Sequence, residues 1–488
     1  MPKEVKDMLR KYVKEFNLSG NYFSTDDQII TCKPCDKRIL VHQKSDLTKH
    51  TNSASHKLKI ISFDGNTESE KSFIEEFKNQ SEFNKFVCEA FVEANIPFHK
   101  LNYPKFNQLL KQCNKFNIPD ESTLRKNYLP KLYNDKMNEI KKIVDNKKIW
   151  VSVDETSDTK LRCIANVLVG VLDDETQKSH LINCVELEKV NSKTIGQLVK
   201  NSLEILQVRP ENVLLFVTDA ARYMGKAYKK ELKGLFTKMI HVTCLAHGLH
   251  RVCDFIRLQF TDVDDLIANV KNIYKKSPKR ILNFKKVAPN LSLPPKPIIT
   301  RWGTWVQAAI YYANNLEIIQ KIINSLNPEE AVSINIVQKL FKKPTLKENL
   351  IYIKSNFSFL PSIINKLQGN VSLCDSMKHI SEAKIHISSL NGEIGDLVKK
   401  KFETVLRNNI GFKLMKNLNN NINYNACEND FGISYTSDEI ICFKNAPITS
   451  CDVERSFSKF KLILTERRES FTLENIKYII IINCNSNI

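Results

Sequence analysis

The stretch of residues 212–250 constrains the fold of this chain more than any other. It opens with an apolar run at 213–217 that ends on Thr-Asp, the acid being Asp219. A short apolar run bounded by polar residues is typical of a strand buried on both faces of a parallel sheet. A basic segment at 221–238 predicts a helix, and a second apolar run follows at 242–244. Because open α/β sheets bind ligands beyond the carboxyl ends of their strands, we expect Asp219 to be a site residue.

Two further acids are candidates for the same site, one after a predicted strand and one on a predicted helix. An apolar run at 149–153 ends on Asp154, and two β-rich runs follow at 163–172 and 180–187. Far downstream, Glu454 lies in a segment that predicts a helix with one buried face. The apolar residues of that face are Val453, Phe457, Phe460 and Leu464. Three strands, a helix and a fourth strand, with acids after the first and fourth strands and on a late helix, form a ribonuclease-H-like arrangement.

Three clustered carboxylates repel one another unless divalent cations lie between them. Mg²⁺ and Mn²⁺ prefer oxygen ligands, and two such ions about 4 Å apart can activate a water or hydroxyl and stabilise the leaving oxygen of a phosphodiester. We therefore predict a catalytic site made of Asp154, Asp219 and Glu454, with Mg²⁺ or Mn²⁺ as its cofactor.

Composition limits the class of protein. The 488 residues predict roughly three domains. The net charge of +19 favours a polyanionic partner, most often nucleic acid, although a generally lysine-rich composition would also produce it. The 13 cysteines are scattered except for one close pair, which indicates a reducing compartment with metal sites. The N-terminus lacks an apolar signal segment and no apolar run is long enough to span a bilayer, so we expect an intracellular protein, nuclear if its partner is DNA.

The close cysteine pair begins a metal-binding pattern in residues 1–60. The spacing is C-x2-C-x14-H-x5-H, with the histidines on an expected helix at 45–56. Two thiolates and two imidazoles make a closed tetrahedral zinc site, and zinc would stabilise a segment with few apolar residues. The ligands are Cys32, Cys35, His50 and His56. Lys44 and Lys49 suit a DNA backbone or major groove, while a finger that binds protein is the alternative.

The chain divides into five predicted regions. These are a zinc finger (1–60), a helical and possibly DNA-binding region (61–145), the first part of the core (146–260), an α-helical insertion (261–445), and the last core helices with a dimerisation region (446–488). The fold class is thus an α/β core of ribonuclease-H-like fold interrupted by a large helical insertion, preceded by a finger and a helical region. The basic helix at 122–142 is equally consistent with a DNA contact and with a solvated charged face.

Several shorter segments carry their own expectations. Residues 271–301 contain nine basic residues and no acid, and their prolines predict a stiff loop that delivers Arg301 and Trp302. An Arg beside an exposed Trp can hold a phosphate and stack on an unpaired base. We also expect a helix at 192–206 capped by Ser192 and an exposed loop at 417–425. The apolar run at 476–482 is either the last core element or a partner-facing surface.

Together these motifs resemble the hAT transposases, named for hobo, Activator and Tam3. The resemblance covers most of the chain, and its most specific motif is Val-Glu-Arg-Ser-Phe-Ser at 453–458. The other motifs are Ser-Val-Asp-Glu-Thr at 152–156, Val-Thr-Asp at 217–219, Cys-x2-His at 244–247, Thr-Arg-Trp at 300–302, and Phe-Thr-Leu-Glu-Asn at 471–475. One departure is Ala220, where many members carry an Asn, which affects a side-chain contact. The finger is similar to those of this family and of the CGG-triplet-repeat-binding protein.

The resemblance implies roles for these residues. Asp154, Asp219 and Glu454 would be the metal-binding catalytic acids. The motif at 453–458, with the 471–475 segment that follows it, would be the C-terminal signature associated with a homodimer or higher homo-oligomer. Arg301 and Trp302 would handle the flipped or hairpinned DNA end. The residues that match the family motif near the active site are Cys244 and His247. Their structural alternatives are a buried small apolar residue and a loop-orienting imidazole, and His250 has a weaker claim to a role.

The function expected from this resemblance is that of a DNA transposase. Water attacks one phosphodiester at the terminal repeats of the element, and the exposed 3′-hydroxyl then attacks the opposite strand to form a hairpin. The alternative is a domesticated regulator that binds specific double-stranded DNA without cutting it. A ribonuclease-H-like nuclease that acts on RNA would explain the sheet and the acids, but not the finger, the Arg-Trp pair and the C-terminal motif together. The recognised DNA sequence stays open.

Overall fold

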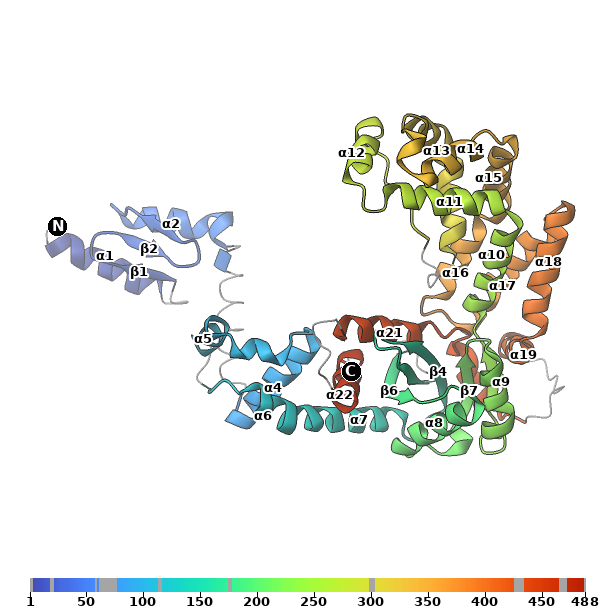
Figure 1. Cartoon of the computed structure of the whole chain (residues 1–488). Coiled ribbons are helices and arrows are strands. Elements are labelled where there is room, and N and C mark those ends of the chain that lie inside the picture. The colour runs from blue at the N-terminus through green and yellow to red at the C-terminus, as the bar shows by residue number, and fades with distance from the viewer. Residues whose placement is uncertain are drawn as a thin grey trace. The chain divides into compact units, whose positions relative to one another are not determined.

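The computed structural model describes residues 3–17, 22–57, 59–60, 77–112, 116–173, 178–297, 303–424, 434–464 and 472–486 (Figure 1). It divides into two compact units. The first comprises residues 1–90 and 97–124, and the second comprises residues 91–96 and 125–488. Among the described residues, no helix is both long and apolar enough to cross a membrane.

The first unit begins with a small domain of three antiparallel strands and two helices. These elements are α1 (Lys3–Phe16), β1 (Phe23–Thr25), β2 (Ile30–Cys32), β3 (Lys37–Ile39) and α2 (Lys44–Asn52). The core of this domain is small, with Leu9, Phe23, Ile30 and Leu47 at its centre. The expected helix at 45–56 ends earlier, at Asn52, because Ser53 takes an extended conformation. So few buried side chains make a marginal core that a bound metal would reinforce.

Short helices make up the rest of the first unit. They are α4 (Gln80–Glu93), η1 (Phe98–Asn102), α5 (Pro104–Gln112) and α6 (Glu121–Thr123). The rings of Phe77, Phe83 and Phe116 pack against one another, with centroids 5.2–6.3 Å apart. Helix α5, which lies in the region predicted to be helical and possibly DNA-binding, buries none of its residues. This region is held by aromatic packing and leaves a polar helix surface open to solvent.

A five-stranded mixed sheet organises the second unit. Its strands are β4 (Ile149–Ser157), β5 (Cys163–Val171), β6 (Ser179–Leu187), β7 (Val213–Thr218) and β8 (Ile240–Thr243). The strand order is β6-β5-β4-β7-β8; β4, β5 and β6 are antiparallel neighbours, while β7 pairs in parallel with both β4 and β8. The strands predicted from the apolar runs are all present. Strand β4 extends beyond its predicted end because its ladder with β5 continues to Ser157, whereas its ladder with β7 stops at Ser152.

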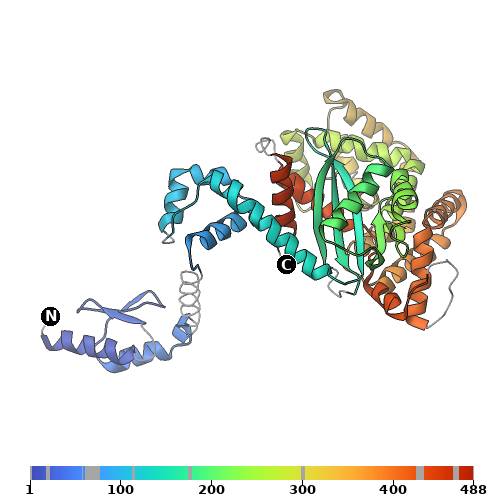
Figure 2. The ribbon, with the colours of Figure 1, turned by 90° about the horizontal axis from the view of Figure 1, so that it is seen from below.

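Helices from both ends of the second unit pack on this sheet. Helix α7 (Leu129–Val144) contacts β5, β6 and α22 (Leu473–Cys484), and α22 lies on β6. Helix α21 (Cys451–Ile463) packs across β4 and β5 (Figures 1 and 2). The apolar run at the end of the chain is therefore a core element, since Ile476 and Ile479–Ile482 are buried inside the unit. Helix α7 belongs to this unit as well, because the first compact unit ends at residue 124.

Local details of the sheet connections differ from expectation. The basic segment after Asp219 is not one helix: α9 (Arg222–Ala227) is followed by the π-helical turn η4 (Tyr228–Leu232), and the chain then turns toward β8 at Gly234, a poor helix former. Helix α8 (Ser192–Ile205) is capped by Asn191 instead of Ser192. The Asn191 side chain accepts hydrogen bonds from the N–H groups of Lys193 and Thr194, which satisfies two otherwise unpaired donors.

Between β8 and α21 the second unit is almost entirely helical. Its helices are α10 (Leu245–Gln259), α11 (Thr261–Tyr274), α12 (Pro278–Val287), α13 (Thr304–Asn324), α14 (Val332–Leu340), α15 (Pro344–Phe357), α16 (Phe359–Leu367), α17 (Leu373–Ser388), α18 (Gly392–Arg407), α19 (Ile410–Tyr424) and α20 (Ser437–Cys442). The expected loop at 417–425 is wrong, because α19 continues to Tyr424. Buried Phe412, Met415 and Leu418 lie at helical spacing and hold that helix despite its asparagines.

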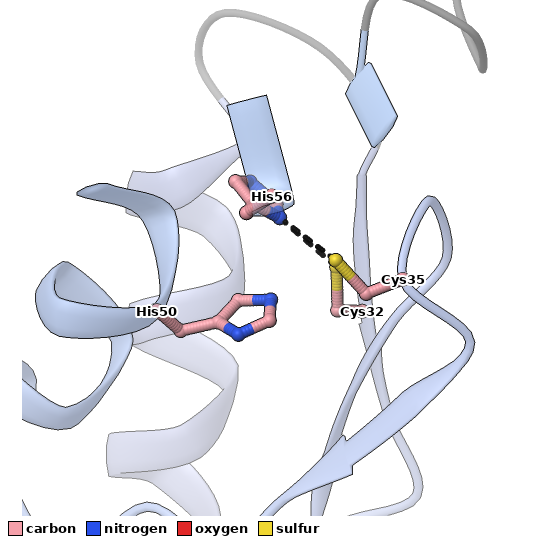
Figure 3. Close-up of side chains that lie close together, drawn as sticks. All are labelled: Cys32, Cys35, His50 and His56. Atoms are coloured by element: carbon pink, nitrogen blue, oxygen red, sulfur yellow. Dashed lines mark hydrogen bonds between the residues drawn. The ribbon is translucent and has the colours of Figure 1, made fainter. Parts of the chain in front are cut away.

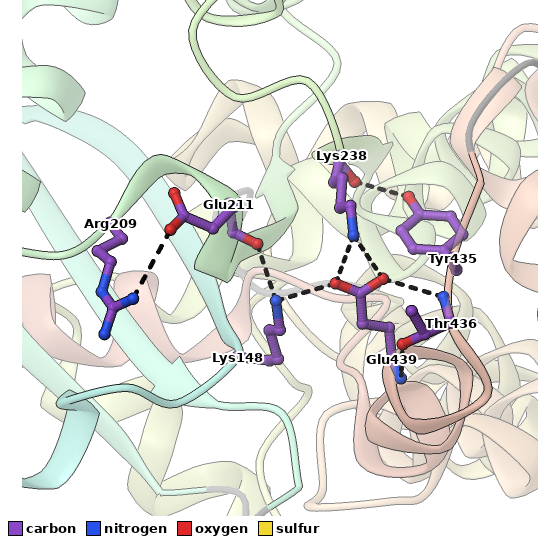
Figure 4. A network of polar contacts seen from close by, with 7 residues as sticks. All are labelled: Lys148, Arg209, Glu211, Lys238, Tyr435, Thr436 and Glu439. Carbon is purple, nitrogen blue, oxygen red and sulfur yellow. Dashed lines mark hydrogen bonds and ion pairs between the residues drawn. The ribbon is translucent and has the colours of Figure 1, made fainter.

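A buried carboxylate joins three distant segments of the second unit (Figure 4). Glu439, at the start of α20, is only 5% exposed and accepts hydrogen bonds from Lys148 Nζ at 2.9 Å and from Lys238 Nζ at 2.7 Å. Burial alone would raise the pKa of Glu439, but these two lysines and the backbone N–H of Thr436 lower it to about 2. The Tyr435 hydroxyl also donates to the carbonyl of Lys238, at 2.6 Å. This network fixes the chain where it returns from the helical insertion to the core.

Candidate active site and candidate zinc site

The predicted zinc ligands converge in the N-terminal domain (Figure 3). Cys32 ends β2, Cys35 lies in the turn after it, His50 is on α2, and His56 follows the helix break. One ligand atom from each residue can be chosen so that all four lie within 4.8 Å of one another. The thiol sulfurs of Cys32 and Cys35 are 3.5 and 3.3 Å from His56 Nδ1. The break at Ser53 makes this possible, since an unbroken helix would place residues 50 and 56 on different faces.

The chemistry of this cluster fits a zinc ion. His50 Nε2 is buried and has no hydrogen-bond partner among the described residues. Burial raises the pKa of the Cys32 thiol to about 11, while it lowers the pKa values of His50 and His56. Neutral imidazoles are ready ligands, whereas a thiolate in such surroundings needs a cation beside it. Two thiols and two imidazoles form the set that binds structural zinc.

The two lysines proposed to contact DNA both lie on α2. Lys44 and Lys49 line a shallow surface depression of about 600 Å³ together with Ser45, Thr48 and Asn52. Lys44 forms an ion pair with Glu15, so part of its charge is already balanced. Lys49 is exposed and forms no ion pair with any described residue. Of the two, Lys49 is therefore the more available for an anionic partner.

The second unit brings the three predicted acids toward one site. Strands β4 and β7 run in parallel, with Ser152 paired to Val217. Asp154 and Asp219 each lie two residues beyond that pair, so the register places them at the same level of the sheet edge. Glu454 is on the first turn of α21, which packs on β4. Residues from opposite ends of the unit thus meet at the carboxyl ends of the parallel strands.

The electrostatics of Asp154 reflect this crowding. Burial, together with the nearby carboxylates of Asp219 and Glu155, raises the pKa of Asp154 well above its usual value. Only the neighbouring His247 and a hydrogen bond from the Glu155 N–H, 2.9 Å long, oppose the shift. Repulsion of this kind is relieved by a bound cation, so the donor set fits a hard divalent metal ion. Within the described residues, however, these acids do not form a ligand group as tight as that of the finger.

His247 connects the acids to the start of α10. Its Nε2 atom is 2.8 Å from Glu454 Oε1. Burial alone would lower the pKa of His247, but the contacts with Cys244 and Glu454 raise it, so the imidazole is cationic beside the carboxylate. Cys244 is fully buried and its sulfur accepts a hydrogen bond from the Ser450 N–H at 3.2 Å. Cys244 therefore supports the site from within the protein, and His247 contacts a predicted catalytic acid directly.

Most of these side chains line one cleft of about 800 Å³. Its acidic end holds Asp154, Glu155 and Glu454, whereas Asp219 is not part of the lining. Helices α10, α13 and α16 supply the uncharged or weakly basic groups of the wall: His250, Thr304, Gln307, Asn365 and Gln368. His250 Nε2 lies 3.4 Å from Asp254. The predicted Arg301 and Trp302 lie outside the described residues; the nearby Thr304 and Gln307 line the cleft.

Glu155 also lines the cleft, although no role was predicted for it. The hydroxyl of Tyr223, on α9, donates a hydrogen bond to Glu155 Oε1, while Glu155 Oε2 is buried and has no partner among the described residues. Burial raises the pKa of Glu155, and Asp219 adds to the shift. Strand alternation points successive residues to opposite faces, so pattern alone would place Glu155 away from Asp154. Only its position directly after Asp154 could have drawn attention to it.

The chain is similar to known proteins in two respects. Residues 119–273 match a family described as a domain of unknown function, DUF659, and this region includes Asp154 and Asp219 but ends before Glu454. In structure, the chain is similar to one from the Drosophila P element transposase strand transfer complex. Their sequences are 11% identical and the TM-score is 0.39, over 82% of this chain and 92% of that chain. No curated protein matches the sequence.

Proposed function

We propose that this protein is an hAT-type DNA transposase that cuts DNA at the ends of its element with a metal-dependent site. One observation carries the proposal: the parallel register of β4 and β7 sets Asp154 level with Asp219, and Glu454 reaches the same cleft from α21. The strand order and the helical insertion between the second and third acids support a ribonuclease-H-like core. Three of the hAT-like motifs contribute residues to the lining of this cleft: 152–156, 244–247 and 453–458.

The acids of the site and the neighbouring His247 would have different roles. Asp154, Asp219 and Glu454 would hold Mg²⁺ or Mn²⁺, which supplies charge for activating a water or hydroxyl and for stabilising the leaving oxygen. His247 holds the Glu454 carboxylate in place through its 2.8 Å contact. A partner of this kind orients a metal ligand, and its loss typically costs about 10–100-fold in metal affinity or activity.

The finger completes the proposed function. A zinc ion on Cys32, Cys35, His50 and His56 would order the N-terminal domain and present α2, with Lys49 exposed, to the phosphates of double-stranded DNA. Such a protein would act in the nucleus and would bring two DNA ends together as a dimer or higher oligomer. The buried C-terminal isoleucines leave the outer faces of α21 and α22 as the parts of that region available to a second copy.

The test is strand cleavage of DNA that flanks the gene, with Mg²⁺ or Mn²⁺. We expect wild-type protein to produce nicks and hairpins, and Asp219→Ala and Glu454→Gln to produce neither. Glu204→Gln is the matched control, because Glu204 is an exposed acid on α8 outside the cleft. Cleavage that survives in either active-site variant would show that the assignment of the acids is wrong.

A domesticated DNA-binding regulator is the second candidate. It is favoured by the ion pair between His247 and Glu454, which occupies a carboxylate oxygen. Zinc-dependent binding of specific DNA by all of these variants, without cleavage by any of them, would support this candidate over the transposase.

A further inference from the structure

Helix α21 carries more than an acid on the side that faces the cleft. Glu454, Ser458 and Lys461 all line it, at positions i, i+4 and i+7 of one helix face. The cleft therefore continues from its acidic end along α21 to a hydroxyl and then to an ammonium group. Ser458 is the last residue of the motif at 453–458, but neither Ser458 nor Lys461 is among the residues predicted to bind DNA or metal.

Ser458 and Lys461 differ from their neighbour Arg455 in their hydrogen bonds and ion pairs. Arg455 is bound to the carboxylate of Asp452 and to the carbonyl oxygen of Gln368 on the turn after α16, so it ties two helices together. Lys461 and Ser458 are exposed, and neither forms an ion pair or a hydrogen bond with a described residue. Among the described residues, the ammonium group of Lys461 and the hydroxyl of Ser458 thus line the cleft without a hydrogen-bond or ion-pair partner.

The spacing along the helix matches a nucleic-acid strand. At about 1.5 Å per residue, Ser458 and Lys461 lie about 6 and 10 Å along the axis from Glu454. Phosphates of one DNA strand recur about every 3.4 Å along the duplex axis. A strand that lies along α21 therefore passes two or three phosphates between the acid and the lysine.

We propose that Ser458 and Lys461 bind the phosphates next to the one that is cut, so that α21 sets the position of the strand relative to the catalytic acids. This inference rests on the proposed function for its substrate class. The cleft is also lined by the amides of Gln307, Asn365 and Gln368, which can hydrogen-bond to sugar, phosphate or base edges. The acids hold the cation, while the rest of the cleft offers donors to a polyanion.

The experiment measures binding of the full-length protein to one duplex DNA at several salt concentrations, without divalent metal. The variants are Lys461→Gln, Lys461→Arg and the control Lys459→Gln. Lys459 is on the same helix but points elsewhere, with Nζ 3.1 Å from the carbonyl oxygen of Asn483. The finger is identical in the wild type and the three variants. A difference between them in the slope of log K against log salt therefore reports on the substituted lysine.

We expect the slope of log K against log salt to fall by about 0.9 in Lys461→Gln and to be unchanged in Lys461→Arg and Lys459→Gln. Cleavage by Lys461→Gln should weaken without a change in the Mn²⁺ concentration at half-maximal activity, whereas Glu454→Gln should not cleave at any Mn²⁺ concentration. Equal slopes for all four proteins, or no binding by the wild type, would overturn the inference. If Lys461→Gln lowers the slope but the wild type does not cut DNA, the phosphate contact of Lys461 is supported and the proposed cleavage activity is rejected.

Discussion

At the scale of single residues, the position of an acid along a strand decides whether its carboxylate lies near the other acids of the site. Asp154 and Asp219 were predictable because each follows an apolar run, and the parallel register then sets them side by side. The part played by Glu155 was not predictable, since it depends on Tyr223 from another element. The helix cap was also not predictable. Asn191 and Ser192 are both polar residues that can cap a helix, and it is Asn191 that adopts the extended conformation and caps α8.

Because carboxylates crowd around Asp154, removing its charge should stabilise the fold but abolish activity. Because its folded pKa is raised, the ionised carboxyl costs stability above its unfolded pKa, and the cost grows as pH rises toward the folded value. We expect Asp154→Asn to raise the metal-free melting temperature at pH 7 by about 2–4 °C while abolishing cleavage. Calorimetry checks this, with Asp173→Asn, an exposed acid, as the unchanged control. Mn²⁺ should stabilise only the wild type; equal stabilisation of both would contradict the assignment.

At the scale of elements, the spacing in the sequence predicted which four residues gather into a possible metal site, but not the helix break that brings them together. The C-x2-C and H-x5-H pattern identified all four residues, which gather within 4.8 Å. The break at Ser53 could not be predicted from helix propensity, because the polar segment around it continues a helical composition. In the same way, the asparagines of α19 favoured a loop, and only the packing of Phe412, Met415 and Leu418 made them helical.

Removal of the metal should unfold the finger alone. Zinc binding contributes on the order of 10 kcal/mol to domains of this kind, whereas the core around Leu9, Phe23 and Leu47 is small. Chelation, or Cys35→Ser, should therefore abolish hydrogen-exchange protection in residues 22–57 and leave the five-stranded sheet protected. Elemental analysis should find one zinc ion lost per chain, and Cys374→Ser should lose none. Unchanged protection after chelation would show that the four residues do not bind a structural metal.

At the scale of the whole molecule, the unit that carries the acids is assembled from segments that lie far apart in the chain. The sequence indicated a helical insertion between Asp219 and Glu454, and the second unit has one. It could not indicate that α13 and α16 form the wall opposite α21, because that depends on how the helices pack rather than on their periodicity. The network at Glu439 was equally hidden, since its lysines come from two other segments.

The Glu439 network predicts an acid-sensitive second unit. The folded pKa of Glu439 is depressed to about 2, so its contribution is fully present above the unfolded value of 4.5 and is lost as pH falls toward 2. A shift of this size corresponds to about 3 kcal/mol. We expect Glu439→Gln to lower the free energy of unfolding by about that amount at pH 7, measured by urea titration, and by much less at pH 3. Glu382→Gln, which removes an exposed ion pair with Lys366, should have almost no effect.

The place of Glu454 on α21 also matters for how the protein is made. Ribosomes complete the finger first, then the strands that carry Asp154 and Asp219, and only after the whole helical insertion the helix with the third acid. A nascent chain can thus present its finger long before the cleft exists. Under the proposed function, a chain that stops before α21 would carry the finger without a complete set of acids, and it would compete with the full-length chain for the same DNA.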